Sequence, residues 1–432
     1  MQNDFGGDSL RKSKNVLRMK PRFLLFAFFT VTGSLSQAFA QNYDTNNPVV
    51  QTFVGSGFYG YLDGQGTQTM FNNPSAVVAD SSSNLFVLDN SNYRIRKVTP
   101  DGTVSTFAGG GSGAIPGYGT NVSLSPYTFS SYTTMAIDHS NALWINAING
   151  SAYLLRIGSD GYISSSSPGL SLPGGLAVDS ANNLYISDYG AHKIYRFHTN
   201  GTLEVFAGSG NSGYVDGNGI FTSFEYPTAL TADQGDNIYV FDGQTIRKIN
   251  QNHDVTTIAG QPFVYSDADG VGTGATFSTV SGMCTDNSGN IFLATSSSIR
   301  RMSVATNVVT VAGSFSQSGY ANGAGSVARF SGAHGVCISQ SMLFVADAGN
   351  QRIRSIAFNP SAQVVTGANL AINTYPGLTI IGIVGRTYQI ETSPDTINWT
   401  AHATILLPSS PYLWFDQDPV AGNRFYRALL LP

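Results

Sequence analysis

Glutamate and histidine side chains can supply acid–base or metal-binding chemistry, and this chain has few of either. Its glutamates are Glu204, Glu225 and Glu391, and it has six histidines in 432 residues. Glu225 and His334 each precede a run that predicts a β-strand, so both are expected where a loop enters a sheet. One glutamate and one histidine fall short of the three or more protein ligands of a usual zinc site. The sequence also lacks a Gly-x-Ser-x-Gly nucleophile motif.

Two glycine-rich segments, residues 55–60 and 208–213, match the Gly-x-Gly-x-x-Gly pattern of dinucleotide-binding loops. That pattern needs a helix directly after it, because the helix N-terminus meets the pyrophosphate. Asp-Gly pairs and further glycines follow instead, and glycine disfavours a helix. We therefore interpret both segments as loops between structural repeats. The Asp-Gly pairs are expected to form turns, since the chelating glutamate of a calcium loop is missing. Four of these loops then pass through a phenylalanine, which we expect to plug the gap between neighbouring repeats: Phe71, Phe224, Phe277 and Phe330.

Tyrosine-rich loops suggest binding rather than catalysis. A tyrosine contributes a large apolar ring and a polar hydroxyl, which suits peptide or sugar ligands. We expect the loops that enter the first strands, and the turns after the second strands, to gather on one face. Simple packing of the loops by their tyrosines is the alternative. The candidate ligand-binding residues on this face are Tyr61, Asn72, Tyr132, Tyr189, Glu225, Tyr226, Arg329 and His334.

The unit that must position these side chains is clearest at residues 77–109. It contains four short runs rich in β-branched and aromatic residues, each closed by turn residues, which predicts four antiparallel strands. An isolated sheet of this size buries too little apolar surface, so it requires copies of itself to pack against. The chain contains six copies. The residues that end their first strands are Asp80, Asp138, Asp179, Asp233, Asp286 and Ser339.

Six four-stranded units, about 40 to 60 residues apart, predict an all-β fold with a six-bladed β-propeller. Residues 49–55 resemble a fourth strand but precede the first copy. We expect them to form the outer strand of the last blade and so to close the ring. The repeated aspartates are expected to stabilise turns, because a single catalytic residue would not recur in every blade.

Residues 343–354, with the sequence LFVADAGNQRIR, resemble the core motif of the NHL-repeat family. The resemblance covers about residues 49 to 365 and implies a six-bladed propeller. Copies two and five depart from the motif, with Ala147 and Thr295 in place of aspartate. Relatives of this family include calcium-dependent lactonases and zinc lyases. The resemblance therefore implies an alternative function, a metal-dependent hydrolase or lyase that would use Glu225 and His334 at the channel mouth.

Both ends of the chain differ from the repeats. Residues 1–40 predict a signal peptide: Lys20 and Arg22 precede an apolar run, and Ala38-Phe39-Ala40 matches a cleavage site. The apolar run is short for a membrane anchor. Residues 41–366 are assigned to the propeller and residues 367–432 to a small, sandwich-like C-terminal β-module. This last part resembles a module found at the C-terminus of many secreted bacterial proteins.

Charge and cysteine content limit the partners. The chain has 22 basic and 26 acidic residues, and cleavage of the basic N-terminal segment makes it more acidic, which argues against nucleic acid and membrane partners. Cys284 and Cys337 occupy equivalent positions in neighbouring repeats, so we expect free buried thiols. No cofactor is expected, and calcium is the one ion worth considering. The sequence thus predicts an exported, non-catalytic binding or scaffold protein for a protein, peptide or glycan.

Overall fold

The computed structural model describes residues 48–130, 132–358, 377–380, 387–393, 399–406, 412–415 and 425–430. The chain divides into two compact units, Met1–Ser361 and Ala362–Pro432. The predicted signal peptide and the expected boundary near residue 366 lie outside the described residues. No helix in the described ranges is long and apolar enough to cross a membrane.

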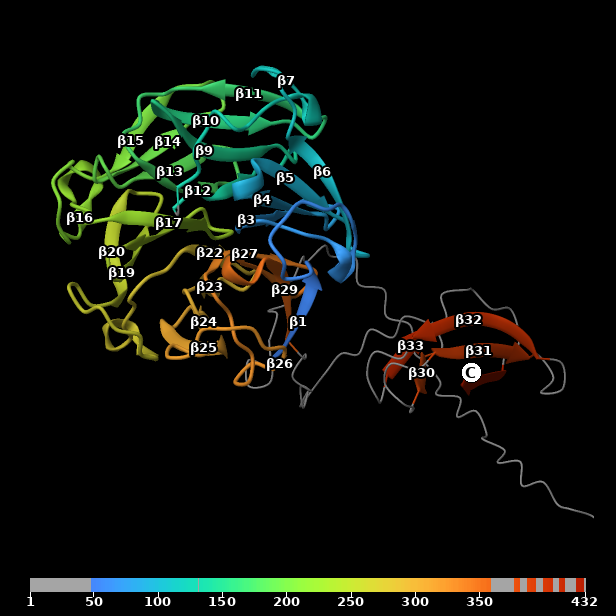
Figure 1. The fold of residues 1–432 in the computed structure, drawn as a ribbon. Coiled ribbons are helices and arrows are strands. Elements are labelled where there is room, and N and C mark those ends of the chain that lie inside the picture. Colours follow the sequence, from blue (N-terminus) through green and yellow to red (C-terminus); the bar gives the residue numbers. More distant parts are fainter. Residues whose placement is uncertain are drawn as a thin grey trace, which may run out of the picture. The chain divides into compact units, whose positions relative to one another are not determined.

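The first unit is a six-bladed β-propeller, as the repeat predicts (Figure 1). Each blade is an antiparallel sheet whose first strand in the repeat lies innermost. In the order inner to outer, blade 1 is β3 (Pro74–Ala79), β4 (Leu85–Asp89), β5 (Arg94–Val98) and β6 (Thr103–Gly109); blade 2 is β8 (Met135–Ile137), β9 (Leu143–Asn149), β10 (Ser151–Ile157) and β11 (Tyr162–Ser166); blade 3 is β12 (Pro173–Val178), β13 (Leu184–Asp188), β14 (Lys193–Phe197) and β15 (Leu203–Ala207).

The second half of the ring follows the same order. Blade 4 is β17 (Pro227–Ala232), β18 (Ile238–Asp242), β19 (Thr245–Ile249) and β20 (Asp254–Gly260); blade 5 is β22 (Gly282–Thr285), β23 (Ile291–Ala294), β24 (Ser298–Met302) and β25 (Asn307–Gly313); blade 6 is β27 (Ala333–Ser339), β28 (Met342–Asp347), β29 (Arg352–Ala357) and β1 (Val49–Val54). Strand β1 pairs antiparallel with β29, so the segment before the first copy closes the ring, as predicted.

Five blades carry a fifth strand that the sequence did not predict. It has two residues, pairs with the outer strand of the blade, and belongs to the loop that then crosses to the inner strand. Blade 3 has no such strand in the described structure, because only a short loop joins β11 to β12. The extra strands are β2 (Gly64–Gln65), β7 (Gly117–Tyr118), β16 (Gly217–Asn218), β21 (Gly270–Val271) and β26 (Gly323–Ala324).

The glycine-rich loops are followed by no α-helix, which confirms their interpretation as inter-blade loops. Single turns of 3-10 helix occur at η1 (Gly66–Gln68), η2 (Asn90–Asn92), η3 (Gly119–Asn121), η4 (Gly219–Phe221), η5 (Gly272–Gly274) and η6 (Ala348–Asn350). The outer strand β6 ends in a glycine, Gly109, because the backbone of the turn before β5 comes very close to it. At Gly109, where φ is +83°, a Cβ atom would lie 2.4 Å from the carbonyl oxygen of Tyr93.

The core consists of six apolar clusters, and each joins two neighbouring blades. The crossing loops contribute four fully buried phenylalanines to these clusters, which confirms that they plug the gaps between blades. Full burial of such a side chain stabilises the fold by about 1.5–3 kcal/mol. The four are Phe71, Phe224, Phe277 and Phe330.

The second unit contains two small antiparallel sheets. Strands β30 (Gly377–Ile380) and β33 (Tyr412–Phe415) form the first; β31 (Thr387–Ser393), β32 (Thr400–Leu406) and β34 (Phe425–Leu430) form the second, with β31 in the middle. Tyr388 and Ile390 of β31 are buried.

Buried arginines tie the crossing loops to the blades. In blade 4, Arg247 is fully buried and forms an ion pair with Asp242, with Nη1 and Oδ2 3.0 Å apart. The same guanidinium donates to the carbonyl oxygens of Ser223 and Val215 and to Asp216, all in the crossing loop. Asp242 also accepts a bond of 2.6 Å from the amide of Tyr226. This arginine clasp therefore holds the middle of the loop and its end next to β17.

The clasp recurs in three more blades. Arg96 pairs with Asp89 and Arg354 with Asp347, at 2.8 Å and 2.7 Å, and all four side chains are fully buried. In blade 5, Thr295 replaces the aspartate, and Arg300 pairs with Asp269 of the crossing loop at 3.1 Å instead. The second-strand aspartates therefore stabilise the incoming loop and the buried arginine, a role that the sequence did not predict. The aspartates that end the first strands bond their own turns, as predicted; Asp80, for example, accepts bonds from the amides of Ser82 and Asn84.

Removal of one clasp partner should leave a buried charge without its buried counter-charge. We expect Asp242→Ala to destabilise the propeller by about 3–5 kcal/mol, because Arg247 then stays buried without its carboxylate. The measurement is urea unfolding, with Asp160→Ala, which alters an exposed turn, as the control. The pair Asp242→Leu and Arg247→Met should recover most of this stability. A loss no larger than that of the control would contradict the role of the clasp.

Candidate ligand-binding pocket

A pocket of about 610 Å³ lies on the loop face, at the mouth of the central channel. Its floor comes from the first residues of three inner strands or the residues just before them, namely Thr228, Ser281 and His334. Its walls come from the loops that enter blades 2, 4, 5 and 6, and from the turns after β18 and β23. Pockets for small ligands have volumes on the order of 300–1,000 Å³.

Four of the predicted site residues line this pocket: Tyr132, Glu225, Tyr226 and His334. They come from the loops that enter blades 2 and 4 and from the start of β27 in blade 6, so only the closed ring brings them together. Tyr214, a tyrosine of the same loop face, also lines it.

Tyr189 does not line the pocket, but its ring contacts two tyrosines that do, so the three form a cluster. Its ring centroid lies 5.3 Å from that of Tyr132 and 4.9 Å from that of Tyr226, and the last two are 6.0 Å apart. The cluster forms beside blade 3, because the turn after β13 of this blade supplies Tyr189. Blade 3 is also the blade without a fifth, two-residue strand in the described structure. Tyr226 keeps 41% of its surface exposed, so its ring is available to a ligand.

The other three predicted residues lie apart from the pocket. The ring of Tyr61 packs under two arginines, with the guanidinium carbons of Arg94 and Arg96 4.1 Å and 4.9 Å from its centroid. Tyr320 of blade 6 has the same environment, with Arg352 and Arg354 at 3.9 Å and 4.8 Å. This recurrence shows that Tyr61 takes part in the repeated loop structure.

Asn72 and Arg329 also have structural contacts. The amide of Asn72 donates to the buried carboxylate of Asp89 over 2.7 Å. Arg329 donates to Gln317 and to three carbonyl oxygens of its own loop. Both residues hold crossing loops in place.

The pocket residues that the sequence did not predict include Gln244 and Tyr265. Gln244 Oε1 accepts bonds from the hydroxyl of Tyr214, at 3.0 Å, and from the amide of Phe263, at 3.2 Å. Gly243 precedes it with φ of +63°, and a Cβ atom there would lie 2.1 Å from the Tyr214 hydroxyl. The sequence signal that could have identified Gln244 is Asp-Gly-Gln at residues 242–244, because it predicts a turn after a second strand, and such turns lie on the loop face.

Burial favours the uncharged form of several side chains in and beside the pocket. It lowers the pKa of His334, so the imidazole is neutral at neutral pH. Burial raises the pKa of Tyr214, Tyr189 and Tyr226, which therefore stay phenols. Glu225 Oε2 accepts a hydrogen bond of 2.5 Å from Ser212. No lysine or arginine lines the pocket.

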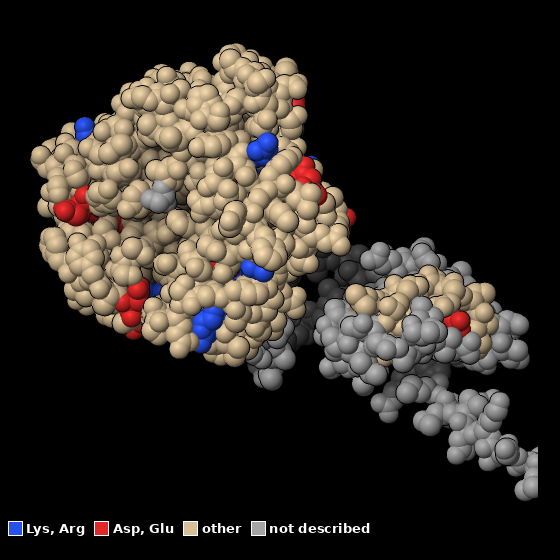
Figure 2. All heavy atoms as spheres, in the orientation of Figure 1, with Lys and Arg blue, Asp and Glu red and all other residues tan. Residues whose placement is uncertain are grey.

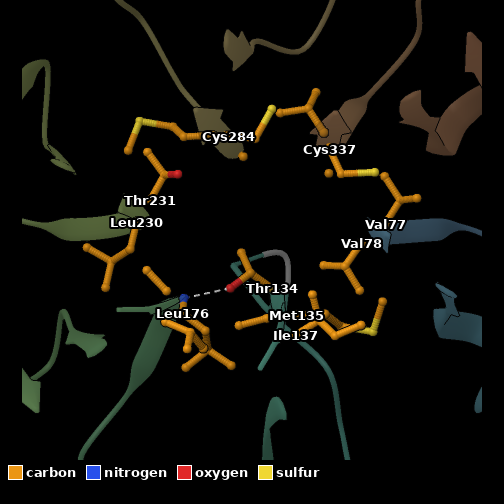
Figure 3. A pocket seen from close by; sticks show the side chains of 18 of the residues that line it. Val77, Val78, Thr134, Met135, Ile137, Leu176, Leu230, Thr231, Cys284 and Cys337 are labelled. Carbon is orange, nitrogen blue, oxygen red and sulfur yellow. Dashed lines mark hydrogen bonds between the residues drawn. The ribbon is translucent and has the colours of Figure 1, made fainter. Parts of the chain in front are cut away.

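The channel below the pocket is lined mainly by small and apolar side chains, together with threonines such as Thr134 and Thr231 (Figure 3). It has a volume of about 310 Å³ and is lined by all six inner strands, without any charged side chain. Leu176 donates its amide to Thr134 Oγ1 across neighbouring blades, over 2.8 Å. Cys284 and Cys337 are free, as predicted, and burial raises the pKa of both thiols. The channel therefore offers neither an ionised nucleophile nor a charged binding group.

Metal ligands do not gather in the described part of the chain: no three His, Cys, Asp or Glu side chains are placed to hold one ion. Glu225 and His334 share a pocket, but no third such residue joins them there.

Comparison with solved structures identifies the class of fold. A Bacteroides thetaiotaomicron protein of unknown function is 18% identical, with a TM-score of 0.57, over 72% of this chain and 76% of its own. An auxiliary nutrient binding protein from Bacteroides ovatus is 18% identical, with a TM-score of 0.53, over 73% and 77%. Another from B. thetaiotaomicron is 17% identical, with a TM-score of 0.55, over 72% and 76%. No family model matches the chain, and no curated protein matches it significantly. At these identities the likeness concerns the six-bladed fold.

The structural role of Tyr61 can be tested without a ligand. Tyr61→Ala should destabilise the propeller by about 1 kcal/mol, because it removes the cation–π contacts with Arg94 and Arg96. It also removes the hydroxyl that bonds Thr106 Oγ1 at 2.9 Å. Urea unfolding measures the loss, and Tyr59→Ala is the matched control because Tyr59 is 80% exposed. Equal stability of the two variants would argue against this role.

Proposed function

We propose that this chain is an exported, non-catalytic binding protein that recognises a protein, peptide or glycan in the pocket at the channel mouth. The observation that carries the proposal is the convergence of tyrosine rings and polar side chains from four blades on one concave site. Ligand sites in proteins commonly combine aromatic walls with a few placed polar groups.

The rigidity of the site supports binding. The amide of Tyr226 is fixed by Asp242, and Asp242 by Arg247, so the clasp holds the loop that carries Glu225 and Tyr226. A preorganised site loses less entropy when a ligand binds.

Two further lines support the proposal. Two fold neighbours are auxiliary nutrient binding proteins, a role that agrees with binding through a pocket. The signal-like segment at residues 1–40 and the resemblance to secreted NHL-repeat proteins support export and this family assignment, both of which belong to the proposal.

The alternative is a metal-dependent hydrolase or lyase, similar to the lactonases, that acts at the channel mouth. Its residues would be Glu225 and His334, which share the pocket. Elemental analysis of the purified protein separates the two functions. Stoichiometric calcium or zinc in the protein would favour the enzyme. A metal that binds the native state also raises its melting temperature, so added calcium or zinc should then raise it as well.

Tyr226 should be a main contact of the ligand. We expect Tyr226→Ala to weaken binding at least about tenfold, because exposed aromatic anchors in a pocket carry much of the binding energy. The measurement is a screen of glycan and peptide arrays followed by calorimetric titration of the strongest compound. Tyr118→Ala is the control, because Tyr118 is 58% exposed and lies in β7, away from the pocket. Unchanged affinity in Tyr226→Ala would place the site elsewhere.

Binding should not depend on pH around neutrality. Burial holds the pKa of His334 below 6.5, so the imidazole stays neutral above that value and protonates only in more acid solution. We expect a constant affinity from about pH 6.5 to about pH 8, measured by the same titration. A loss of affinity with a midpoint inside this range, absent from His334→Gln, would mean that a charged imidazole takes part.

A further inference from the structure

We propose that the pocket selects a neutral saccharide, an inference that rests on the proposed binding function and specifies its ligand. The argument uses the charge of the lining, its unused hydrogen-bonding groups and the shape of its apolar surface.

The charge of the lining disfavours ionic ligands. Glu225 is the one carboxylate there, and Ser212 already occupies one of its oxygens. An anionic ligand would meet this carboxylate and no lysine or arginine, and its desolvated charge would stay unpaired. A cationic ligand would find a single partner. On the propeller face shown in Figure 2, charged side chains are also sparse.

The hydrogen-bonding groups of the lining suit hydroxyl groups. The side chains of Thr279, Ser281 and Ser296 line the pocket and form no hydrogen bond within the described structure. Gln244 uses its Oε1 for Tyr214 and Phe263, which leaves both Nε2 hydrogens for a ligand. Each hydroxyl can both donate and accept, as can each hydroxyl of a saccharide. A neutral ligand rich in hydroxyls would satisfy these groups without burying a charge.

The exposed apolar surface of the pocket suits the flat face of a sugar ring. Tyr226 and Tyr265 present exposed rings at the rim, 41% and 72% exposed. The C–H face of a pyranose can pack on such a ring while its hydroxyls reach the polar groups.

The test compares ligand classes on the full mature chain. The probes are neutral oligosaccharides (cellohexaose, laminarihexaose, xylohexaose and mannohexaose), an anionic oligogalacturonate and a peptide library. Binding is measured by calorimetry for the wild type, Tyr226→Ala and Gln244→Glu. The second variant keeps the oxygen that Tyr214 and Phe263 use but replaces the free Nε2 donor. Gln51→Glu, on the exposed side of β1, is its control, and melting temperatures confirm that all variants fold.

We expect at least one neutral oligosaccharide to bind, and both pocket variants to weaken it about tenfold while the control does not. Pocket-dependent binding of oligogalacturonate or a peptide instead would overturn the saccharide inference and leave the proposed function standing. Absence of any binding, or binding that neither pocket variant changes, would overturn both.

Discussion

The buried ion pair between the third-strand arginine and the second-strand aspartate is the interaction on which the loop face depends. A lone arginine inside a β-sheet protein would be strongly destabilising, and the ion pair alone would hardly repay the cost of removing both charges from water. The arrangement becomes favourable because the guanidinium also bonds carbonyl oxygens of the crossing loop, as Arg247 does with Ser223 and Val215. The same contacts that satisfy the charge therefore fix the loop.

The two blades without the clasp show the same constraint, namely that a buried arginine requires a carboxylate partner. In blade 2, Ala147 and Leu155 stand at the aspartate and arginine positions, and both lie in one apolar cluster. Both partners have thus been exchanged together, as expected when an unpaired buried charge is costly. In blade 3, Tyr195 takes the arginine register, and Asp188 accepts amide bonds from Ser171 and Leu172 instead. This blade has only a short loop, and the tyrosine cluster forms beside it.

Most of the fold could be predicted from the sequence, because strand length, turn residues and the repeat are local signals. The number of blades, the closing strand and the phenylalanine plugs follow from them. The two-residue outer strands, such as β2, could not be predicted, because Gly64-Gln65 has no strand propensity and pairs only through its place in the loop. The role of Arg96 and its equivalents was missed, since their alternation with Ile95 resembles an exposed strand face.

The site was harder to predict than the fold. Tyrosines of the loop face look alike in the sequence, yet Tyr61 packs under arginines of its own blade, whereas Tyr226 borders the pocket. The difference depends on the neighbouring blade, which lies far away in the chain. Gln244 was missed because its significance comes from Tyr214, thirty residues earlier, and from the bend at Gly243. Sequence reasoning identified the face, and only the closed ring identified the pocket.

The central claim is that the pocket over blades 4 to 6 is where this propeller holds its ligand. A crystal structure of the mature protein with its tightest-binding neutral oligosaccharide tests it most directly. Our account predicts a sugar ring packed on Tyr226, with a hydroxyl within hydrogen-bond distance of Gln244 Nε2 and the loop backbone unmoved. Sugar bound on the C-terminal unit or on another face of the propeller, with this pocket holding only water, would contradict it.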